Sequence, residues 1–126
     1  MRKLVTDVAI IGGGAAGIPA AIEAAQAGAK TDVFEALDHT GGPCNGGNGV
    51  FAVESKMQKQ KQYTYTKEEI LRYWMEYTHN NVDLRLVSEF INRSAETVDW
   101  LIGYGVDLND LIAYYPGAYY VWHFSR

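Results

Sequence analysis

The chain of 126 residues has few of the features that mark secreted, metal-binding or membrane-embedded proteins. Cys44 is its single cysteine, so an intramolecular disulfide is impossible and no zinc cluster of cysteines is spelled out. No segment approaches the ~20 consecutive apolar residues of a membrane-spanning helix. The first expected strand starts within about three residues of Met1, which leaves no room for a signal peptide. These absences predict a soluble, cytoplasmic protein.

The net charge is also small. It is −4 at pH 7, so the composition gives no reason to expect a nucleic acid or an anionic membrane as a partner. With 48% hydrophobic and 21% charged residues, the chain has a globular composition rather than a disordered one. Lys56, Lys59 and Lys61 form a short basic run in which glutamines alternate. We interpret this run as a solvated helix face or loop.

Glycine is abundant by contrast, and its spacing near the N-terminus gives the strongest signal. An apolar run at residues 4–11 predicts a buried strand, and an alanine-rich segment at residues 15–27 predicts a helix. Between them, Gly12 to Gly17 follow the order Gly-x-Gly-x-x-Gly. A second apolar run, residues 31–35, ends on an acidic residue. This order of strand, glycine turn, helix, strand and acid is typical of a dinucleotide-binding βαβ unit.

Each residue of this motif has a physical role in such a site. Gly12 permits a tight turn out of the strand, and Gly14 removes a side chain that would keep a pyrophosphate from the backbone. Gly17 lets the helix lie close to the strand. The phosphates then meet free N–H groups at the positive end of the helix. Glu35 is placed to accept hydrogen bonds from the hydroxyls of an adenosine ribose.

A second glycine-rich stretch follows the acid. Residues 38–49 contain five glycines, one proline and two asparagines, and we therefore expect no regular element there. Such a stretch is either a flexible linker or a loop whose backbone approaches a ligand. We favour the ligand loop, because a linker is usually richer in serine and charge.

The remainder of the chain has helical periodicity. Thr66 and Glu69 form a capping box that opens one helix, and a second helix is expected over residues 82–102. The apolar and aromatic residues of both helices are assigned to a core: Ile70, Leu71, Trp74, Met75, Val87, Phe90, Ile91, Val98, Trp100, Leu101 and Ile102.

The last part of the chain, residues 114–124, is rich in aromatic residues. It is interpreted as a hairpin around Pro116 and Gly117, or as one wall of a substrate pocket. His123 lies among these aromatics, where a histidine is usually packed, with contact to a substrate as the alternative.

Only two parallel strands are expected in the whole chain. Doubly wound sheets usually have about four to six strands and are covered on both faces by helices. The sequence therefore predicts an α/β fold that is incomplete, the amino-terminal portion of something larger.

The segments at residues 8–17, 33–35, 41–42 and 45–49 resemble flavoproteins of the fumarate reductase and succinate dehydrogenase type. The similarity is greatest to the soluble fumarate reductase and 3-ketosteroid dehydrogenase-like branch. It implies a flavin-dependent oxidoreductase that reduces or forms an activated C=C bond. The implied substrate is an unsaturated carboxylate or an enone, with an electron-donor protein as a possible partner.

The resemblance also implies a division of the chain. Residues 1–55 are expected to be a Rossmann-like FAD-binding βαβ unit with its flavin loop. Residues 56–126 are expected to be a helical segment that leads into a truncated capping domain. The catalytic residues of the family lie beyond Arg126, so the isolated chain is expected to have no turnover.

Carried over position by position, the family pattern implies a set of FAD contacts. The pattern departs from the family at Pro43 and Cys44, where asparagine and serine are usual. A proline has no N–H to donate, and we interpret Cys44 as a flavin contact rather than a nucleophile, since no base is evident. The implied contacts are Gly12, Gly14, Ala15, Ala16, Gly17, Glu35, Ala36, Gly41, Gly42, Cys44, Asn48 and Gly49.

Membrane-bound relatives attach FAD covalently through a histidine in this loop. The corresponding position here is Gly42, so non-covalent FAD is expected. His39 lies three residues away and is the alternative attachment point if the register is shifted.

Two other interpretations stay open at this point. A small NAD-binding Rossmann protein with a regulatory or redox-sensing role would also use Glu35, although such domains rarely place a second glycine cluster after the acid. A helical interaction module built on residues 66–126, with a vestigial glycine motif, is the non-enzymatic alternative.

Overall fold

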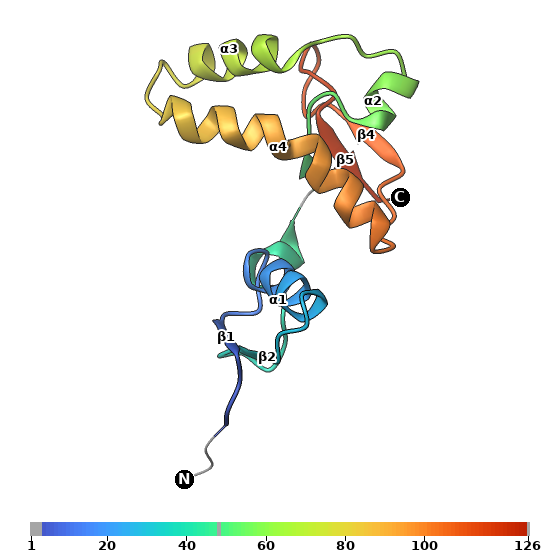
Figure 1. Cartoon of the computed structure of the whole chain (residues 1–126). Helices are drawn as coiled ribbons and strands as arrows, with labels where there is room; N and C mark the ends of the chain where they lie inside the picture. Colours follow the sequence, from blue (N-terminus) through green and yellow to red (C-terminus); the bar gives the residue numbers. More distant parts are fainter. Residues whose placement is uncertain (1–3, 48, 126) are drawn as a thin grey trace. The chain divides into compact units, whose positions relative to one another are not determined.

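The computed structural model describes residues 4–47 and 49–125, and the chain divides into two compact units (Figure 1). Unit 1 is Met1–Gly47 and unit 2 is Asn48–Arg126. The functional domains expected at residues 1–55 and 56–126 remain a prediction.

The elements follow the order β1 (Val8–Ile11), α1 (Gly17–Gln26), β2 (Thr31–Phe34), a 3-10 helix (Gly42–Gly46), β3 (Val50–Phe51), α2 (Lys56–Gln60), α3 (Lys67–Tyr77), α4 (Leu84–Gly103), β4 (Asp110–Ile112) and β5 (Trp122–Phe124).

Unit 1 is the expected βαβ unit. β1 pairs in parallel with β2, with Val8 opposite Thr31 and Ile11 opposite Phe34. Helix α1 provides the crossover between the two strands, as a parallel pair requires. The α/β assignment made from the sequence is therefore confirmed.

The side chains of unit 1 are poorly buried. No residue of α1 is buried, and Ile11, at the carboxyl end of β1, is 83% exposed. Among the described residues, every buried apolar side chain lies between Ala52 and Val121, in unit 2. Because a two-stranded sheet with one helix buries little apolar surface, unit 1 has no core of its own. This observation fits the expectation of an incomplete fold.

Unit 2 combines α2, α3 and α4 with a three-stranded antiparallel sheet in the order β3–β5–β4. β4 pairs with β5 in an antiparallel hairpin whose connection contains Pro116 and Gly117, as expected, but its first strand precedes the aromatic stretch at residues 114–124. The third strand, β3, was not expected from the sequence. It consists of only two residues, and its pairing with β5 joins positions 73 residues apart, Val50 and His123. No local pattern reveals such a distant partner.

The core of unit 2 lies between the helices and the sheet. It contains Val53, Ile70, Val87, Ile91 and Val121, with a second cluster of Ala52, Val98 and Leu108. No helix within the described parts of the chain meets the length and hydropathy needed to cross a membrane.

Two residues of the expected core are more exposed than predicted. Phe90 is 48% exposed and Ile102 is 45% exposed. The ring of Phe90 still stacks on Phe51 at 5.3 Å and meets Trp74 edge-on at 5.9 Å. Helical periodicity identifies the apolar face correctly, but it does not indicate which part of that face this chain covers.

The capping box expected at Thr66 is only half formed. The Thr66 hydroxyl accepts from the Glu69 amide at 3.2 Å, but the Glu69 carboxylate accepts from the Tyr119 hydroxyl at 2.8 Å. A complete capping box occurs instead at α2, where Ser55 and Gln58 exchange hydrogen bonds. Gln58 is 1% exposed, so the interpretation of this basic run as a solvated surface is wrong for that residue.

Candidate functional site

The glycine turn of unit 1 lies between β1 and α1. Gly12 has a φ of 95°, in the left-handed region that favours glycine. A Cβ atom on Gly17 would lie 1.8 Å from the carbonyl oxygen of Gly12, so only a glycine allows α1 to approach the turn this closely. Both residues therefore have the backbone roles expected from the motif.

The next part of the turn is open. A Cβ atom on Gly14 would meet nothing closer than the carbonyl oxygen of Gly41, at 3.9 Å. The N-cap of α1 is Ala16, whose side chain has no oxygen to accept from the first amides of the helix. No side chain caps this helix start, although the Ile18 amide already donates to the Gly14 carbonyl at 3.0 Å and Pro19 has no N–H. A helix start without a side-chain cap is compatible with a bound phosphate.

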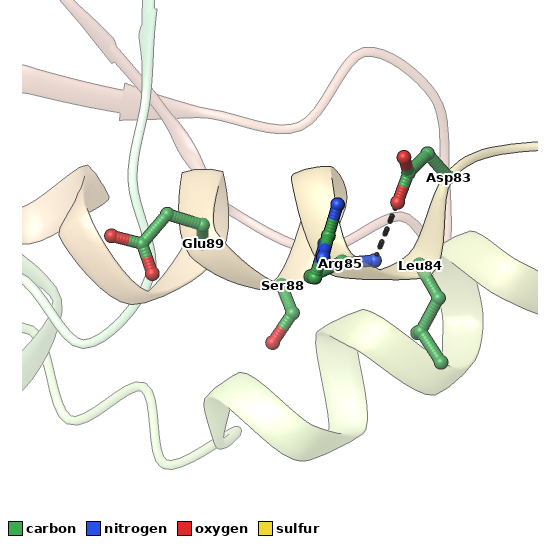
Figure 2. Close-up of a pocket in the computed structure, with 5 residues that line it drawn as sticks. All are labelled: Asp83, Leu84, Arg85, Ser88 and Glu89. Carbon is green, nitrogen blue, oxygen red and sulfur yellow. Dashed lines mark hydrogen bonds between the residues drawn. The ribbon is translucent and has the colours of Figure 1, made fainter.

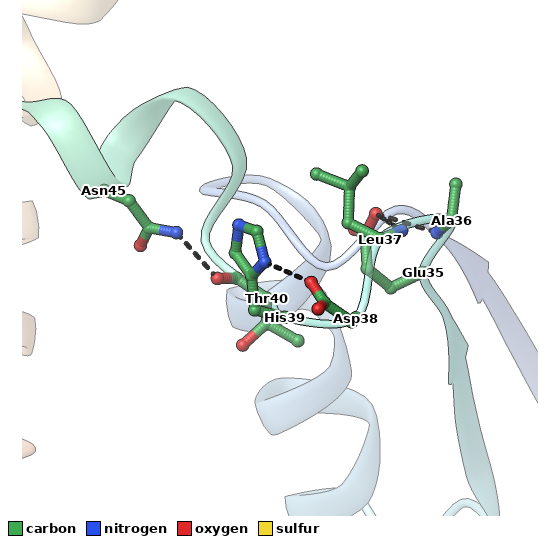
Figure 3. A network of polar contacts seen from close by, with 7 residues as sticks. All are labelled: Glu35, Ala36, Leu37, Asp38, His39, Thr40 and Asn45. Carbon is green, nitrogen blue, oxygen red and sulfur yellow. Dashed lines mark hydrogen bonds and ion pairs between the residues drawn. The ribbon is translucent and has the colours of Figure 1, made fainter.

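Glu35 connects the end of β2 to the glycine turn. Its Oε2 atom accepts from the Gly13 amide at 2.7 Å. Its Oε1 atom accepts from the amides of Ala36 and Leu37 at 2.8 and 3.0 Å (Figure 3). The amides of Leu37 and Gly13 hold the pKa of Glu35 below its ordinary value, so the carboxylate is ionised at neutral pH. An ionised carboxylate is a good acceptor for the hydroxyls of a ribose.

The start of the second glycine loop is bonded to the first. The Gly41 amide donates to the Gly13 carbonyl at 2.7 Å, and Gly14 and Gly41 form an isolated parallel bridge. Gly41 has a φ of 109°, and a Cβ atom there would lie 2.0 Å from Oδ1 of Asn45. Asn45 in turn donates from Nδ2 to the Thr40 carbonyl at 2.9 Å (Figure 3). The two glycine segments therefore form one continuous backbone surface within unit 1.

The expectation that residues 38–49 contain no regular element is wrong in one respect. A 3-10 helix runs over Gly42–Gly46, and Pro43 lies in its first turn, where a missing N–H removes no internal bond. Cys44 lies within this short helix and is exposed. Its amide donates to the Gly41 carbonyl at 3.2 Å. The loop is thus ordered by its own turns.

Ten of the twelve implied FAD contacts lie in unit 1. The structure places Gly12, Gly14, Ala15, Ala16, Gly17, Glu35, Ala36, Gly41, Gly42 and Cys44 in unit 1. Asn48 lies outside the described residues, and Gly49 belongs to unit 2. Contact of these residues with a flavin remains a prediction.

Two residues of the site were missed by the sequence reasoning. Gly13 is buried, donates to Glu35 and accepts from Gly41, so it joins all three parts of the site. A Cβ atom on Gly13 would lie 2.9 Å from Cγ2 of Thr40, which packs over it. The run of three glycines at residues 12–14 is the signal that points to this crowding.

His39 lies on the exposed side of the same loop. Its Nδ1 atom is 2.7 Å from a carboxylate oxygen of Asp38, and its side chain is 60% exposed (Figure 3). Only Gly41 and Thr40 separate it in sequence from Gly42.

His123 is packed, as the commoner interpretation has it. It is completely buried, with Nε2 2.7 Å from the Ser55 hydroxyl and Nδ1 3.2 Å from the Val50 carbonyl. A carbonyl oxygen only accepts, so Nδ1 carries the proton and Nε2 accepts from Ser55. Burial lowers the pKa of His123, which keeps the ring neutral. A ring enclosed in this way does not reach a substrate.

Two hollows occur in unit 2. One lies at the start of α4 and is lined by Asp83, Leu84, Arg85, Ser88 and Glu89 (Figure 2). The Asp83 carboxylate already caps the amides of Arg85 and Leu86, so these two amides are not available to an anion. The other has a volume of about 280 Å³ and is lined largely by aromatic residues of α3 and of the tail, among them Tyr73, Trp74, Tyr114, Tyr115 and Trp122. The described residues contain no group of three His, Cys, Asp or Glu side chains arranged to hold a metal ion.

The comparison with protein families agrees with this geometry. Residues 7–118 match the family described as FAD binding domain. The match begins at β1 and includes both glycine segments, α3 and α4.

The individual proteins to which this chain is similar include reductases and dehydrogenases. The vinyl phenol reductase of Lactiplantibacillus plantarum is 37% identical over 95% of this chain and 24% of its own length. A solved flavocytochrome c3 fumarate reductase in its open conformation has a TM-score of 0.78 at 29% identity, over 86% of this chain and 19% of that one. The 3-ketosteroid-Δ4-(5α)-dehydrogenase of Rhodococcus jostii, solved with 4-androstene-3,17-dione, has a TM-score of 0.73 at 28% identity, over 82% and 22%. The chain thus spans less than a quarter of the length of these relatives.

Proposed function

Since the chain belongs to the family of FAD binding domains, we propose that it is the amino-terminal FAD-binding segment of an oxidoreductase that acts on activated C=C bonds. The observation that carries this proposal is the joining of the two glycine segments and Glu35 through Gly13. The proposal also rests on the family match and on the named reductases and dehydrogenases to which the chain is similar.

Different segments of the chain would bind different parts of FAD. The backbone from Gly14 to Gly17, which is open at Gly14 and has no side-chain cap at the start of α1, would bind the pyrophosphate. Glu35 and the adjoining Ala36 would lie at the adenosine ribose. Gly41, Gly42 and Cys44 would continue the contact along the second loop. Asn48 and Gly49 are proposed to approach the isoalloxazine, as the family resemblance implies.

Bound FAD supplies hydride transfer through its isoalloxazine ring. The residues of this chain would bind and orient the cofactor. The Glu35 carboxylate, whose pKa is lowered, is already ionised at neutral pH and can accept hydrogen bonds from the ribose hydroxyls. The isolated chain is therefore expected to bind flavin without turning over a substrate, because the family's substrate clamps and proton donor would lie in other parts of a longer polypeptide.

We further propose that FAD is held non-covalently. The position of the attachment histidine is occupied by Gly42, which has no side chain to form a bond. His39 is the alternative, and its ring is paired with Asp38.

The substrate of the complete protein is proposed to be a small unsaturated carboxylate, phenol or enone. This proposal is supported by the similar proteins whose names refer to vinyl phenol, fumarate and a ketosteroid. An electron-donor protein and a cytoplasmic location are parts of the same proposal.

A titration of the purified chain with FAD, and separately with NADH, tests this function. Flavin fluorescence should change saturably with FAD, and NADH should leave the intrinsic tryptophan fluorescence unchanged. Saturable NADH binding without FAD binding would favour the small NAD-binding protein instead. Gly14→Val is a matched variant, because its side chain would fill the open part of the turn and should abolish FAD binding.

A further inference from the structure

Strand β5 contacts the far end of the flavin loop. Gly49 has a φ of 111°, and a Cβ atom there would lie 2.4 Å from Cε2 of Phe124. The Phe124 ring therefore packs directly on the Gly49 backbone. The next residue, Val50, is the register partner of His123 and accepts from its Nδ1 atom at 3.2 Å. Two successive residues of β5 thus hold two successive residues at the end of the loop.

A buried network fixes the imidazole that makes this contact. The Ser55 hydroxyl donates to Nε2 of His123 and itself accepts from the Gln58 amide at 3.1 Å. The Gln58 side chain donates to the carbonyls of Ala52 and Tyr120, at 2.9 and 2.8 Å. Ser55, Gln58 and His123 are at most 1% exposed, and no buried side-chain polar atom among the described residues lacks a partner. A fully satisfied network of this kind permits one ring orientation and one tautomer.

We propose that His123 and Phe124 are positioning residues for flavin binding, which act by fixing the backbone of Gly49 and Val50. This inference rests on the proposed function, because it takes the loop that ends at Gly49 to be a flavin loop. At its other end, in unit 1, the loop is fixed by the hydrogen bond from Gly41 to Gly13. Each end therefore has its own anchor, and the second anchor comes from a strand that lies more than seventy residues later in the chain.

The site would gain rigidity from this arrangement. A glycine-rich loop loses much backbone entropy when it orders around a ligand. An end that is already held in its bound conformation reduces this loss and raises affinity. The residues of β5 would thus affect FAD binding without touching FAD.

Two substitutions of His123 separate its two hydrogen bonds. His123→Asn places an amide nitrogen near the position of Nδ1 and keeps the bond to Val50, while it loses the bond to Ser55. His123→Gln places an amide oxygen near the position of Nε2 and keeps the bond to Ser55, while it loses the bond to Val50. Both variants shrink a buried ring, so both should lower stability. Val87→Ala, in α4, is a control for a loss of stability that involves no loop contact.

FAD affinity and backbone dynamics of the full chain then test the proposal. We expect the dissociation constant for FAD to rise about fivefold in His123→Gln, the effect of one lost hydrogen bond, and to change little in His123→Asn or Val87→Ala. In the absence of FAD, ¹⁵N relaxation should show increased motion of the Gly49 and Val50 amides in His123→Gln alone of the three. Phe124→Leu should likewise loosen Gly49.

Equal affinity in all four variants, or a loss that simply follows their stability, would overturn the positioning role. If the unsubstituted chain binds no FAD, the proposed function fails, and the relaxation measurement still decides whether β5 fixes the end of the loop. Unchanged motion of Gly49 and Val50 in both His123→Gln and Phe124→Leu would overturn the inference even where FAD binds.

Discussion

The carboxylate of Glu35 accepts a hydrogen bond of 2.7 Å from the backbone amide of Gly13. This bond connects the end of β2 with the turn that follows β1, so the proposed ribose acceptor and the proposed phosphate-binding turn are held together by the protein itself. Preorganisation of this kind lowers the entropy that a ligand must remove on binding. Because Oε1 already accepts from two amides and Oε2 from one, one acceptor site remains on Oε2 for a ligand hydroxyl.

Replacement of Glu35 should therefore affect both the loop and the ligand. Glu35→Gln removes the charge and offers one acceptor oxygen where the carboxylate has two, so the bonds to Gly13 and to Ala36 and Leu37 cannot all persist. We expect the dissociation constant for FAD, measured by flavin fluorescence, to rise about tenfold, as for the loss of a charge-assisted bond. Asp38→Asn is the control, because that carboxylate is exposed and pairs with His39 in the same loop. Equal losses in the two variants would indicate a general effect of charge.

Gly17 should tolerate no side chain. In Gly17→Ala the added methyl group would lie 1.8 Å from the Gly12 carbonyl oxygen, so α1 must move away from the turn. We expect a cost of about 2 kcal/mol or more in the free energy of unfolding of unit 1, followed by hydrogen exchange of the α1 amides. Gly46→Ala meets no atom within 4 Å and should be neutral or slightly stabilising. A Gly17→Ala protein with unchanged α1 protection would contradict the close approach.

The stability of unit 2 should depend on pH through His123. Burial lowers the pKa of this residue in the folded state below its ordinary value of 6.5. The unfolded chain therefore binds the proton more readily, and stability falls as pH decreases from 6.5 toward the folded-state pKa. The contribution has a slope of at most about 1.4 kcal/mol per pH unit. Urea unfolding at a series of pH values should show this slope in the unsubstituted chain and its reduction in His123→Gln. An identical pH dependence in both would assign the effect to other groups.

Flavin should leave the protein on denaturation. If FAD is bound without a covalent link, acid precipitation of the FAD-loaded chain should leave the yellow colour in the supernatant. Flavin that remains with the polypeptide would contradict the assignment of Gly42 to the attachment position. Repetition with His39→Ala would then show whether His39 forms the link.

The sequence predicts unit 1 well because its signals are local. The turn residues Gly12 and Gly17 and the acid Glu35 all lie within one βαβ unit, where spacing determines geometry. The role of Gly13 is harder to predict, because its amide donates to the Glu35 carboxylate and its carbonyl accepts from the Gly41 amide, and both partners follow β2 in the chain.

Unit 2 is predicted less completely, since its decisive contacts join distant residues. Val50 meets His123, and Gln58 meets the Tyr120 carbonyl, although neither pair is signalled by periodicity. The polar composition of residues 56–61 predicts an exposed segment, yet the Gln58 side chain is buried. Its hydrogen bonds to the carbonyls of Ala52 and Tyr120 explain this burial. Such long-range hydrogen bonds depend on the topology of the fold, which the local pattern of apolar and polar residues does not predict.

The placement of the pyrophosphate on the glycine turn is the central claim, and amide chemical shifts test it most directly. ¹H–¹⁵N spectra of the chain should be recorded during a titration with FAD. We expect the largest shifts at the amides of Gly14, Ala15, Ala16 and Gly17, with smaller ones at Gly41 and Gly42. Saturable binding that leaves the Gly14 to Gly17 amides unshifted, or the absence of any shift up to millimolar FAD, would contradict the claim.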